Sequence, residues 1–248
     1  MRVIVDAAMG APRLSLIGVA AIVAMAFQHV DVGAGGGALG SPPRERFPPS
    51  RVLSEVEARL KLVRASSDGV PSLEFLRAAS AIIAVFDALP GMGMVKKDMI
   101  GNVDKIWRHQ TSGRKTLQQM CLLEIDEFGA ERAARRDGSV CNSLLWLKRA
   151  LRLVEGILME LVRDIAKPMR DCCTAAYSRS LRMHHNLVMR SAFGVAVNAA
   201  PSRADFLQKL APGAADAAAL KAIAKVTAVF SKHLDAIEKF LVSQRIER

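Results

Sequence analysis

Three polar side chains at helical spacing form the first candidate site. Asp98, Asn102 and Lys105 lie at positions i, i+4 and i+7 of a helix-like segment, so we expect them on one face, one above another. Together they offer a hydrogen-bond acceptor, an amide that both donates and accepts, and a cationic donor. This set suits a polyhydroxylated ligand with an amide group nearby. Taken alone, such a stripe is more often a solvated helix face with ion pairs.

A single aromatic residue, Trp146, interrupts the aliphatic run of residues 144–151. An isolated tryptophan of this kind more often fills a core than contacts a ligand. A carbohydrate site nevertheless needs such a ring, because the C–H face of a sugar packs against a flat aromatic surface while its hydroxyls bond to polar neighbours. Trp146 is therefore a candidate platform for a sugar.

Residues 172–185 bring tyrosine, cysteine and histidine together. A histidine among apolar helical residues is usually a structural group, but it can equally donate a hydrogen bond to a buried carbonyl. The spacing of Cys172, Cys173, His184 and His185 fits no common zinc site, so a metal is not expected. The four cysteines are interpreted as reduced, mostly buried thiols of an intracellular protein; they are Cys121, Cys141, Cys172 and Cys173.

The composition favours a mostly helical protein with a basic surface. Half of the 248 residues are apolar, chiefly Ala, Leu, Val and Met, and no sustained alternation is present. A formal net charge of +11 suits nucleic acid, an anionic membrane or an acidic partner, or it is simply a cationic surface. One Tyr and two Trp are too few for a single-strand binder, so no nucleic-acid partner is expected. The sequence contains no phosphate loop and no GxSxG motif, and we expect neither enzymatic activity nor a cofactor.

The first 50 residues differ from the rest. Residues 14–27 form an apolar run of 14 residues, which is short for a membrane span, and Gly-rich and Pro-rich stretches follow it. We interpret residues 1–50 as a disordered extension or a targeting segment. Residues 51–248 are expected to form one folded domain.

Helical spacing of apolar residues begins at Arg51, and Pro, Gly and Ser mark the boundaries. The connections are short, which predicts antiparallel neighbours around one core. The expected helices run from residue 51 to a break at 69–71, from a Ser72 cap to an end at Pro90 and Gly91, over 95–109, over 115–135 after a loop with Ser112 and Gly113, over 141–165, over 168–198 as one long helix, over 202–210, and from about 214 to 243.

Taken together and in order, these segments resemble the glycolipid transfer protein family. The family's Asp-x-x-x-Asn-x-x-Lys helix is similar to Asp98, Asn102 and Lys105, and its Leu-(Leu/Met)-Trp-Leu-x-Arg helix is similar to residues 144–149. Its Ala-Tyr…His helix resembles Ala176, Tyr177 and His185. Further similarity lies at residues 116–118, 124–130 and 200–207. The resemblance covers about residues 72–245.

The resemblance implies an all-α, two-layer helical sandwich of about eight helices, with an apolar tunnel for ceramide chains. It implies that Asp98 accepts from the ceramide amide N–H and that His185 bonds the acyl carbonyl. Asn102 and Lys105 would bond sugar hydroxyls, and Trp146 would stack under the first sugar. The implied protein is a monomeric, cytoplasmic, non-enzymatic carrier that binds a glycosphingolipid and contacts membranes transiently.

The chain departs from the family at one docking position. The family often has His-Gly-Trp where this chain has His185, Asn186 and Leu187, so we expect membrane docking to be weaker or to involve another residue such as Trp107. Residues 245–248 are mostly charged, whereas relatives often end in apolar residues that help close the pocket.

Two other functions are compatible with the sequence. The first is a ceramide-1-phosphate carrier of the same fold, in which Arg149, aided by Lys148, would be an additional anion contact. The phosphate-selective branch places a cationic residue where Trp146 stands, so Trp146 favours a sugar. The second is a basic helical adaptor that binds a protein or nucleic acid and no lipid.

Overall fold

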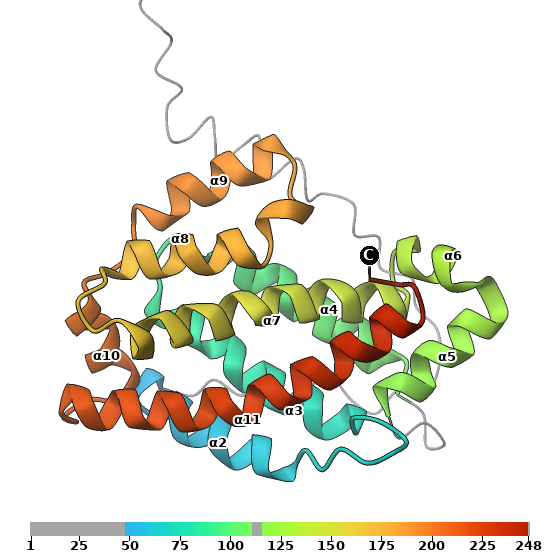
Figure 1. Cartoon of the computed structure of the whole chain (residues 1–248), viewed down its shortest axis with the longest axis horizontal. Coiled ribbons are helices and arrows are strands. Elements are labelled where there is room, and N and C mark those ends of the chain that lie inside the picture. Colours follow the sequence, from blue (N-terminus) through green and yellow to red (C-terminus); the bar gives the residue numbers. More distant parts are fainter. Residues whose placement is uncertain (1–47, 111–115, 248) are drawn as a thin grey trace, which may run out of the picture.

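The computed structural model describes residues 48–110 and 116–247. Within these ranges the chain is helical, apart from short connections and two isolated β-bridges, and the expected all-α class is confirmed. No helix in the described ranges is long and apolar enough to cross a membrane. The elements (Figure 1) are η1 (Pro49–Arg51), α2 (Val52–Leu62), α3 (Ser72–Ile83), η2 (Ala84–Ala88), α4 (Gly93–Arg108), α5 (Leu117–Phe128), α6 (Ala130–Arg135), α7 (Val140–Arg163), α8 (Met169–Arg179), η3 (Arg182–His184), α9 (Leu187–Val197), α10 (Arg203–Leu210) and α11 (Asp216–Ser243).

The helices form two layers around α7. In one layer α7 lies between α8 and α11, and behind it α4, α3 and α2 form the second layer (Figure 1). α7 packs on α4 and α3, and α11 packs on α2, so both long helices join the layers. The core between them includes three fully buried phenylalanines, Phe75, Phe206 and Phe230. This arrangement is the expected two-layer sandwich.

The start of α7 is fixed by side chains from two directions. The Ser139 hydroxyl accepts from the Asn142 N–H at 3.0 Å as an N-cap. The Glu124 carboxylate of α5 accepts from the first two amides of the helix, those of Val140 at 2.7 Å and Cys141 at 2.9 Å. These contacts satisfy donors that have no partner within the helix, and the carboxylate complements the helix dipole. They set the position of Trp146, less than two turns further on.

Two expected boundaries differ from the structure in the first half of the chain. The helix expected over 115–135 is divided at Gly129, whose φ of +77° ends α5 and begins α6. Pro71, not Ser72, is the N-cap residue of α3, and the Ser72 hydroxyl instead donates to the Gln110 side chain at 3.1 Å. Residues 1–47 and the loop expected around Ser112 and Gly113 lie outside the described residues.

The long helix expected over 168–198 was wrong, because the chain turns in its middle. The Ser180 hydroxyl bonds back to the Ala176 carbonyl at 2.8 Å, and α8 ends there. A short 3-10 turn, η3, follows, and Asn186 then caps α9 by accepting from the Met189 N–H at 3.0 Å. His185 therefore lies in a non-helical link between η3 and α9.

Candidate functional site

A cavity of about 670 Å³ lies between α4, α7 and the link that joins α8 to α9. Its wall contains all five residues that the sequence singled out for the ligand, although they come from three separate segments. Apolar side chains of α4 and α9 form much of the remaining wall. The five residues are Asp98, Asn102, Lys105, Trp146 and His185.

Asp98 and Asn102 form a pair on the cavity-facing side of α4. The Asn102 amide donates to the Asp98 carboxylate at 3.2 Å and to the Asp98 backbone carbonyl at 3.1 Å. The Asp98 carboxyl faces the water of the cavity on one side and protein on the others. This partial burial raises its pKa and outweighs the charge of Lys105, which lowers it. The amide contact fixes the carboxylate and leaves it able to accept a further hydrogen bond.

Lys105 has an acidic partner that sequence reasoning missed. Its ammonium lies 2.5 Å from the carboxylate of Asp137, which also lines the cavity. The hydrogen bond from Lys105 lowers the pKa of Asp137 and outweighs the effect of burial, with a further contribution from the Gly138 N–H. In the sequence Asp137 falls between the helices expected over 115–135 and 141–165, and its distance from Lys105 along the chain gave no signal of contact. The pair offers both a donor and acceptors for hydroxyl groups.

The Trp146 ring lies in the cavity wall and contacts charged and aromatic groups. The Arg149 guanidinium lies over the ring at 5.0 Å from its centroid, as in a cation–π contact. The His185 ring is nearly parallel to it, with an interplanar angle of 23° and 6.3 Å between centroids. The His184 ring approaches edge-on at 6.4 Å. These contacts orient the indole.

His185 is oriented by Tyr177 of α8. The Tyr177 hydroxyl lies 3.0 Å from Nδ1 of His185, and the Tyr177 ring stacks on Phe193 of α9 with centroids 3.8 Å apart. Burial lowers the pKa of His185, and the charges of His184 and Arg190 add to this, so the imidazole is neutral at neutral pH. Burial also raises the pKa of Tyr177, which keeps its hydroxyl protonated. When this hydroxyl donates to Nδ1, the imidazole carries its hydrogen on Nε2 and can donate it to a ligand.

Two other predicted residues lie away from this cavity. Arg149 lines a neighbouring cavity between α7, α8 and α11, where its guanidinium pairs with Glu247 at 2.9 Å. Trp107 was considered as a substitute for membrane docking, but its residue exposure is only 6%, so it presents no aromatic surface to a membrane. All four cysteines are buried and free, and the described residues contain no group of three or more metal-ligating side chains placed to hold an ion.

A comparison with known families identifies the family of this chain. A family model described as glycolipid transfer protein matches residues 70–212, more than half of the chain. The chain belongs to the glycolipid transfer protein family. Its members are lipid transfer proteins and not enzymes. The expected family is thus confirmed.

Two relatives match just over half of this chain. The chain is 35% identical over 147 residues to pleckstrin homology domain-containing family A member 8 of Rattus norvegicus, a match that covers 57% of this chain but 27% of that relative. It is 34% identical over 154 residues to the glycolipid transfer protein of Danio rerio, covering 58% of this chain and 72% of the relative. The chain therefore spans less than a third of the length of the first relative.

Two solved structures of the glycolipid transfer protein fold are similar to the whole domain. One, which is described as showing how FAPP2 selects simple glycosphingolipids with this fold, has a TM-score of 0.70 and 25% identity, and covers 79% of this chain and 97% of that chain. The apo form of mouse ceramide-1-phosphate transfer protein also has a TM-score of 0.70, with 20% identity, and covers 81% of this chain and 98% of that chain. The second likeness shows the fold alone.

Proposed function

We propose that this chain carries a glycosphingolipid between membranes, with the sugar against Trp146 and the ceramide amide between Asp98 and His185. Asp98 would accept the amide N–H, and Nε2 of His185 would donate to the acyl carbonyl. An amide that enters an apolar cavity has to keep its hydrogen bonds, because each one lost costs about 1–3 kcal/mol. The two residues supply one acceptor and one donor, which matches the needs of one amide group.

The charge of the cavity wall is the observation that carries this proposal. Among the residues that the structure describes, Lys105 is the one Lys or Arg in the wall, and Asp137 holds it in an ion pair. A phosphate group needs several cationic donors that have no other carboxylate partner. A neutral sugar needs mixed donors and acceptors beside a flat ring, which Asn102, Lys105, Asp137 and Trp146 provide. The wall thus favours glycosylceramide over ceramide-1-phosphate.

The rest of the cavity suits hydrocarbon chains. Its apolar wall is formed mostly by α4 and α9, with small and flexible side chains that adapt to chains of different shape. No specific partner is needed there, because the hydrophobic effect depends on area and not on direction. The apolar wall includes Met94, Val95, Met189, Ala192, Phe193, Val195 and Ala196.

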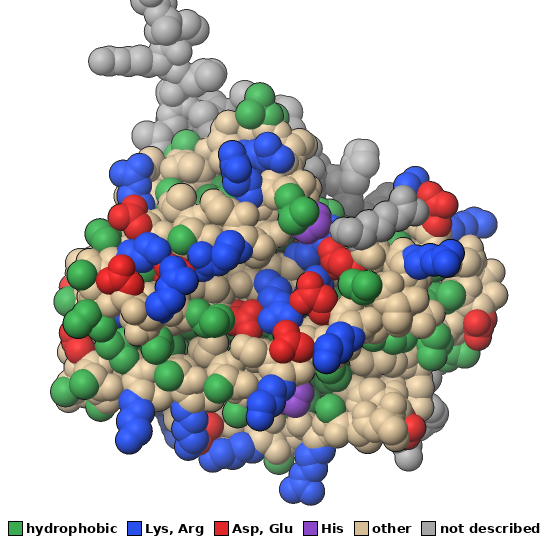
Figure 2. Space-filling view, viewed as in Figure 1, with side chains coloured by type: hydrophobic (Ala, Val, Ile, Leu, Met, Phe, Trp, Pro, Cys, Tyr) green, Lys and Arg blue, Asp and Glu red, His purple; other side chains and the backbone are tan. Residues whose placement is uncertain are grey.

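An exposed apolar patch beside the cavity supports membrane contact. Leu187 is 78% exposed and Met183 is 72% exposed, and both are close in the chain to His185 and Asn186 of the cavity wall. Arg182 of η3 and Arg190 of α9 belong to the same stretch of chain, and Figure 2 shows cationic side chains in the region of α9, which would favour an anionic membrane surface. We infer that this patch takes the docking role that a tryptophan has elsewhere in the family.

A lipid-capture experiment tests the ligand. The purified chain is incubated with phosphatidylcholine vesicles that contain equal amounts of galactosylceramide and ceramide-1-phosphate, re-isolated, and extracted for mass spectrometry. We expect galactosylceramide in clear excess. Ceramide-1-phosphate in excess would overturn the proposal, and the absence of both lipids would favour the adaptor function.

A pair of variants tests the docking patch. Leu187→Asp should weaken sedimentation with vesicles and slow transfer by about tenfold, because a charge cannot enter the membrane interface cheaply. Ile165→Asp is the matched control, since Ile165 is 74% exposed but lies in the α7–α8 connection, at the opposite end of α8. Equal losses in the two variants would contradict the assignment of the patch.

A further inference from the structure

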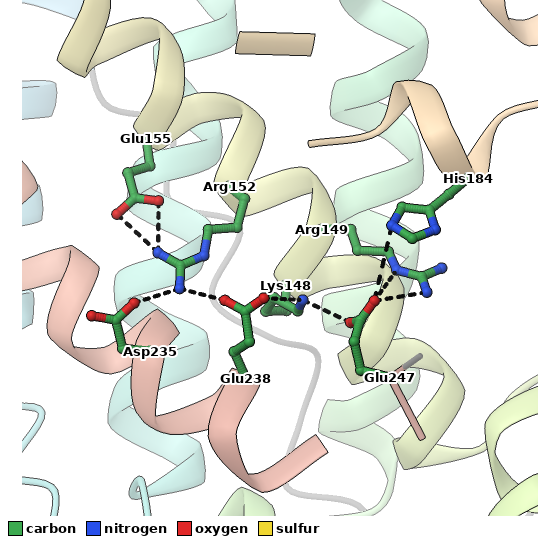
Figure 3. A network of polar contacts seen from close by, with 8 residues as sticks. All are labelled: Lys148, Arg149, Arg152, Glu155, His184, Asp235, Glu238 and Glu247. Atoms are coloured by element: carbon green, nitrogen blue, oxygen red, sulfur yellow. Dashed lines mark hydrogen bonds and ion pairs between the residues drawn. The ribbon is translucent and has the colours of Figure 1, made fainter. Parts of the chain in front are cut away.

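Glu247 is part of a network of charged side chains beside the headgroup cavity (Figure 3). Its carboxylate accepts from Nε of Arg149 at 3.1 Å and from Nη2 at 2.9 Å, and it pairs with Nζ of Lys148 at 2.7 Å. Figure 3 shows this carboxylate pointing from the segment after α11 toward α7. The contacts join residues that lie about a hundred positions apart in the chain.

The segment that carries Glu247 is folded back on α11. The N–H groups of Ile246 and Glu247 both donate to the Leu241 carbonyl, at 2.9 and 3.2 Å, and the Ile246 side chain is buried. The turn requires a positive φ of 59° at Arg245. The backbone therefore fixes the Cα of Glu247, and its side chain is only 10% exposed, so the carboxylate is held against Lys148 and Arg149.

The charge of Glu247 is stabilised where it lies. Burial opposes its ionisation, but hydrogen bonds from Lys148 and Arg149 outweigh burial and lower its pKa. Lys148 is 4% exposed and has a second carboxylate partner, Glu238, at 3.4 Å. In the hydrogen bonds and ion pairs of the described residues, by contrast, Glu247 is the one carboxylate that contacts Arg149.

Two side chains connect this carboxylate to the headgroup cavity. His184 lines the cavity, and its Nε2 lies 3.9 Å from the Glu247 carboxylate, but burial lowers its pKa, so it is the neutral connection at neutral pH. Arg149 is the cationic connection. Its guanidinium lies over the Trp146 ring, whereas Trp146 itself lines the headgroup cavity and Arg149 does not. Arginine is the side chain best suited to bind a phosphate group. An unpaired guanidinium at this position would make the surroundings of the headgroup more positive and would favour an anionic ligand.

We propose that Glu247 is a specificity-determining residue, which excludes anionic headgroups by holding Arg149 in a neutral pair behind Trp146. This inference rests on the proposed function, because it explains why a carrier with an arginine so close to its headgroup site would prefer a neutral sugar. Glu247 contacts no ligand in this account and acts through Arg149.

The network contains a matched control for this role. Glu238 carries the same charge and pairs with Lys148 and with Arg152, the latter at 2.6 Å, but has no contact with Arg149. Glu238→Gln therefore removes one negative charge from the same network and leaves Arg149 paired. Glu247→Gln removes the same charge and releases Arg149.

The test compares transfer of galactosylceramide and ceramide-1-phosphate between phosphatidylcholine vesicles at one ionic strength. We expect Glu247→Gln to raise the rate for ceramide-1-phosphate on the order of tenfold relative to galactosylceramide, about the effect of one charge-assisted hydrogen bond. Glu238→Gln should keep the wild-type ratio. The double variant Glu247→Gln/Arg149→Gln should return to the wild-type ratio, because the released cation is gone. Thermal melting followed by circular dichroism reports whether each variant is folded.

The outcomes separate this inference from the proposed function. If wild type transfers galactosylceramide but Glu247→Gln and Glu238→Gln give the same ratio, the role of Glu247 is wrong and the proposed function stands. A gain that persists in the double variant also overturns the inference, since Arg149 would then not be the cause. Wild type that transfers ceramide-1-phosphate faster than galactosylceramide overturns both. If Glu247→Gln does not fold, the single variant Arg149→Gln decides. Its ratio of ceramide-1-phosphate to galactosylceramide transfer should equal that of wild type, and a large difference between the two ratios contradicts a neutralised Arg149.

Discussion

The hydroxyl of Tyr177 lies 3.0 Å from Nδ1 of His185 and occupies that nitrogen, which leaves Nε2 of the imidazole for a ligand. Tyr177→Phe should lower galactosylceramide transfer about fivefold, the effect of one neutral hydrogen bond of about 1 kcal/mol. The Phe ring keeps the stacking on Phe193, so the melting temperature should change little. His185→Ala, which removes the donor itself, serves as the reference and should abolish transfer. Full activity of Tyr177→Phe in a vesicle assay would show that the tyrosine does not set the tautomer.

Asp98 should combine a functional gain with a structural cost. Burial raises its pKa, which means that the folded state without a ligand disfavours the ionised carboxylate that the ceramide N–H requires. Asp98→Asn should therefore reduce transfer by on the order of tenfold while the melting temperature of the unliganded protein stays equal to wild type or rises. Calorimetry of the two unliganded proteins at pH 7 makes the comparison. A melting temperature well below that of wild type would contradict this account of the charge.

Two partly buried histidines, His184 and His185, and one buried histidine, His233, predict a loss of stability in mild acid. Burial is the largest cause that lowers the pKa of His184, His185 and His233. The unfolded chain, with an ordinary histidine pKa of about 6.5, then binds more protons than the folded chain. The free energy of unfolding should consequently fall as pH drops through and below about 6.5.

Urea unfolding at pH 7.5, 6.5 and 5.5 measures this loss. His233→Gln should reduce it without affecting the cavity, since His233 lies in α11 and not in the cavity wall. The carboxylates with lowered pKa values, such as Glu247, lose their contribution only at more acidic pH, so they do not account for a loss in this range. Stability that rises between pH 7.5 and 5.5 would contradict the prediction.

The residues before the helical domain should be dispensable for lipid transfer. The sequence placed the boundary at Arg51, whereas η1 begins at Pro49 and packs on α10 and η2, with Val52 fully buried behind it. A chain that begins at Pro48 should therefore keep the melting temperature and transfer rate of the full chain. A chain that begins at Val52 should melt at a lower temperature, because it lacks η1. Loss of lipid transfer in the first of these chains would place part of the site before residue 48.

The sequence indicated the local part of the site and missed the part made by distant contacts. Asp98, Asn102 and Lys105 could be placed on one face because a helix fixes that geometry over seven residues. The position of His185 depends on the break at Ser180, where a side chain competes with the helix, and helical periodicity does not reveal such a break.

Contacts between remote segments left even less trace in the sequence. The pairing of Lys105 with Asp137 and of Arg149 with Glu247 follows from the packing of separate elements. A charged residue carries no periodic signal of its partner, so the sequence could suggest Arg149 as an anion contact but could not show the carboxylate beside it. The family resemblance supplied the ligand class, and only the structure supplied these pairs.

The central claim is that the flat ring of Trp146 selects a sugar headgroup over a phosphate. The most direct measurement is the ratio of galactosylceramide to ceramide-1-phosphate transfer between phosphatidylcholine vesicles, for wild type and Trp146→Arg, at one ionic strength because the chain is strongly cationic. We expect wild type to transfer galactosylceramide and almost no ceramide-1-phosphate, and Trp146→Arg to shift the ratio toward ceramide-1-phosphate by on the order of tenfold or more. Wild type that transfers ceramide-1-phosphate and ignores galactosylceramide would contradict the account.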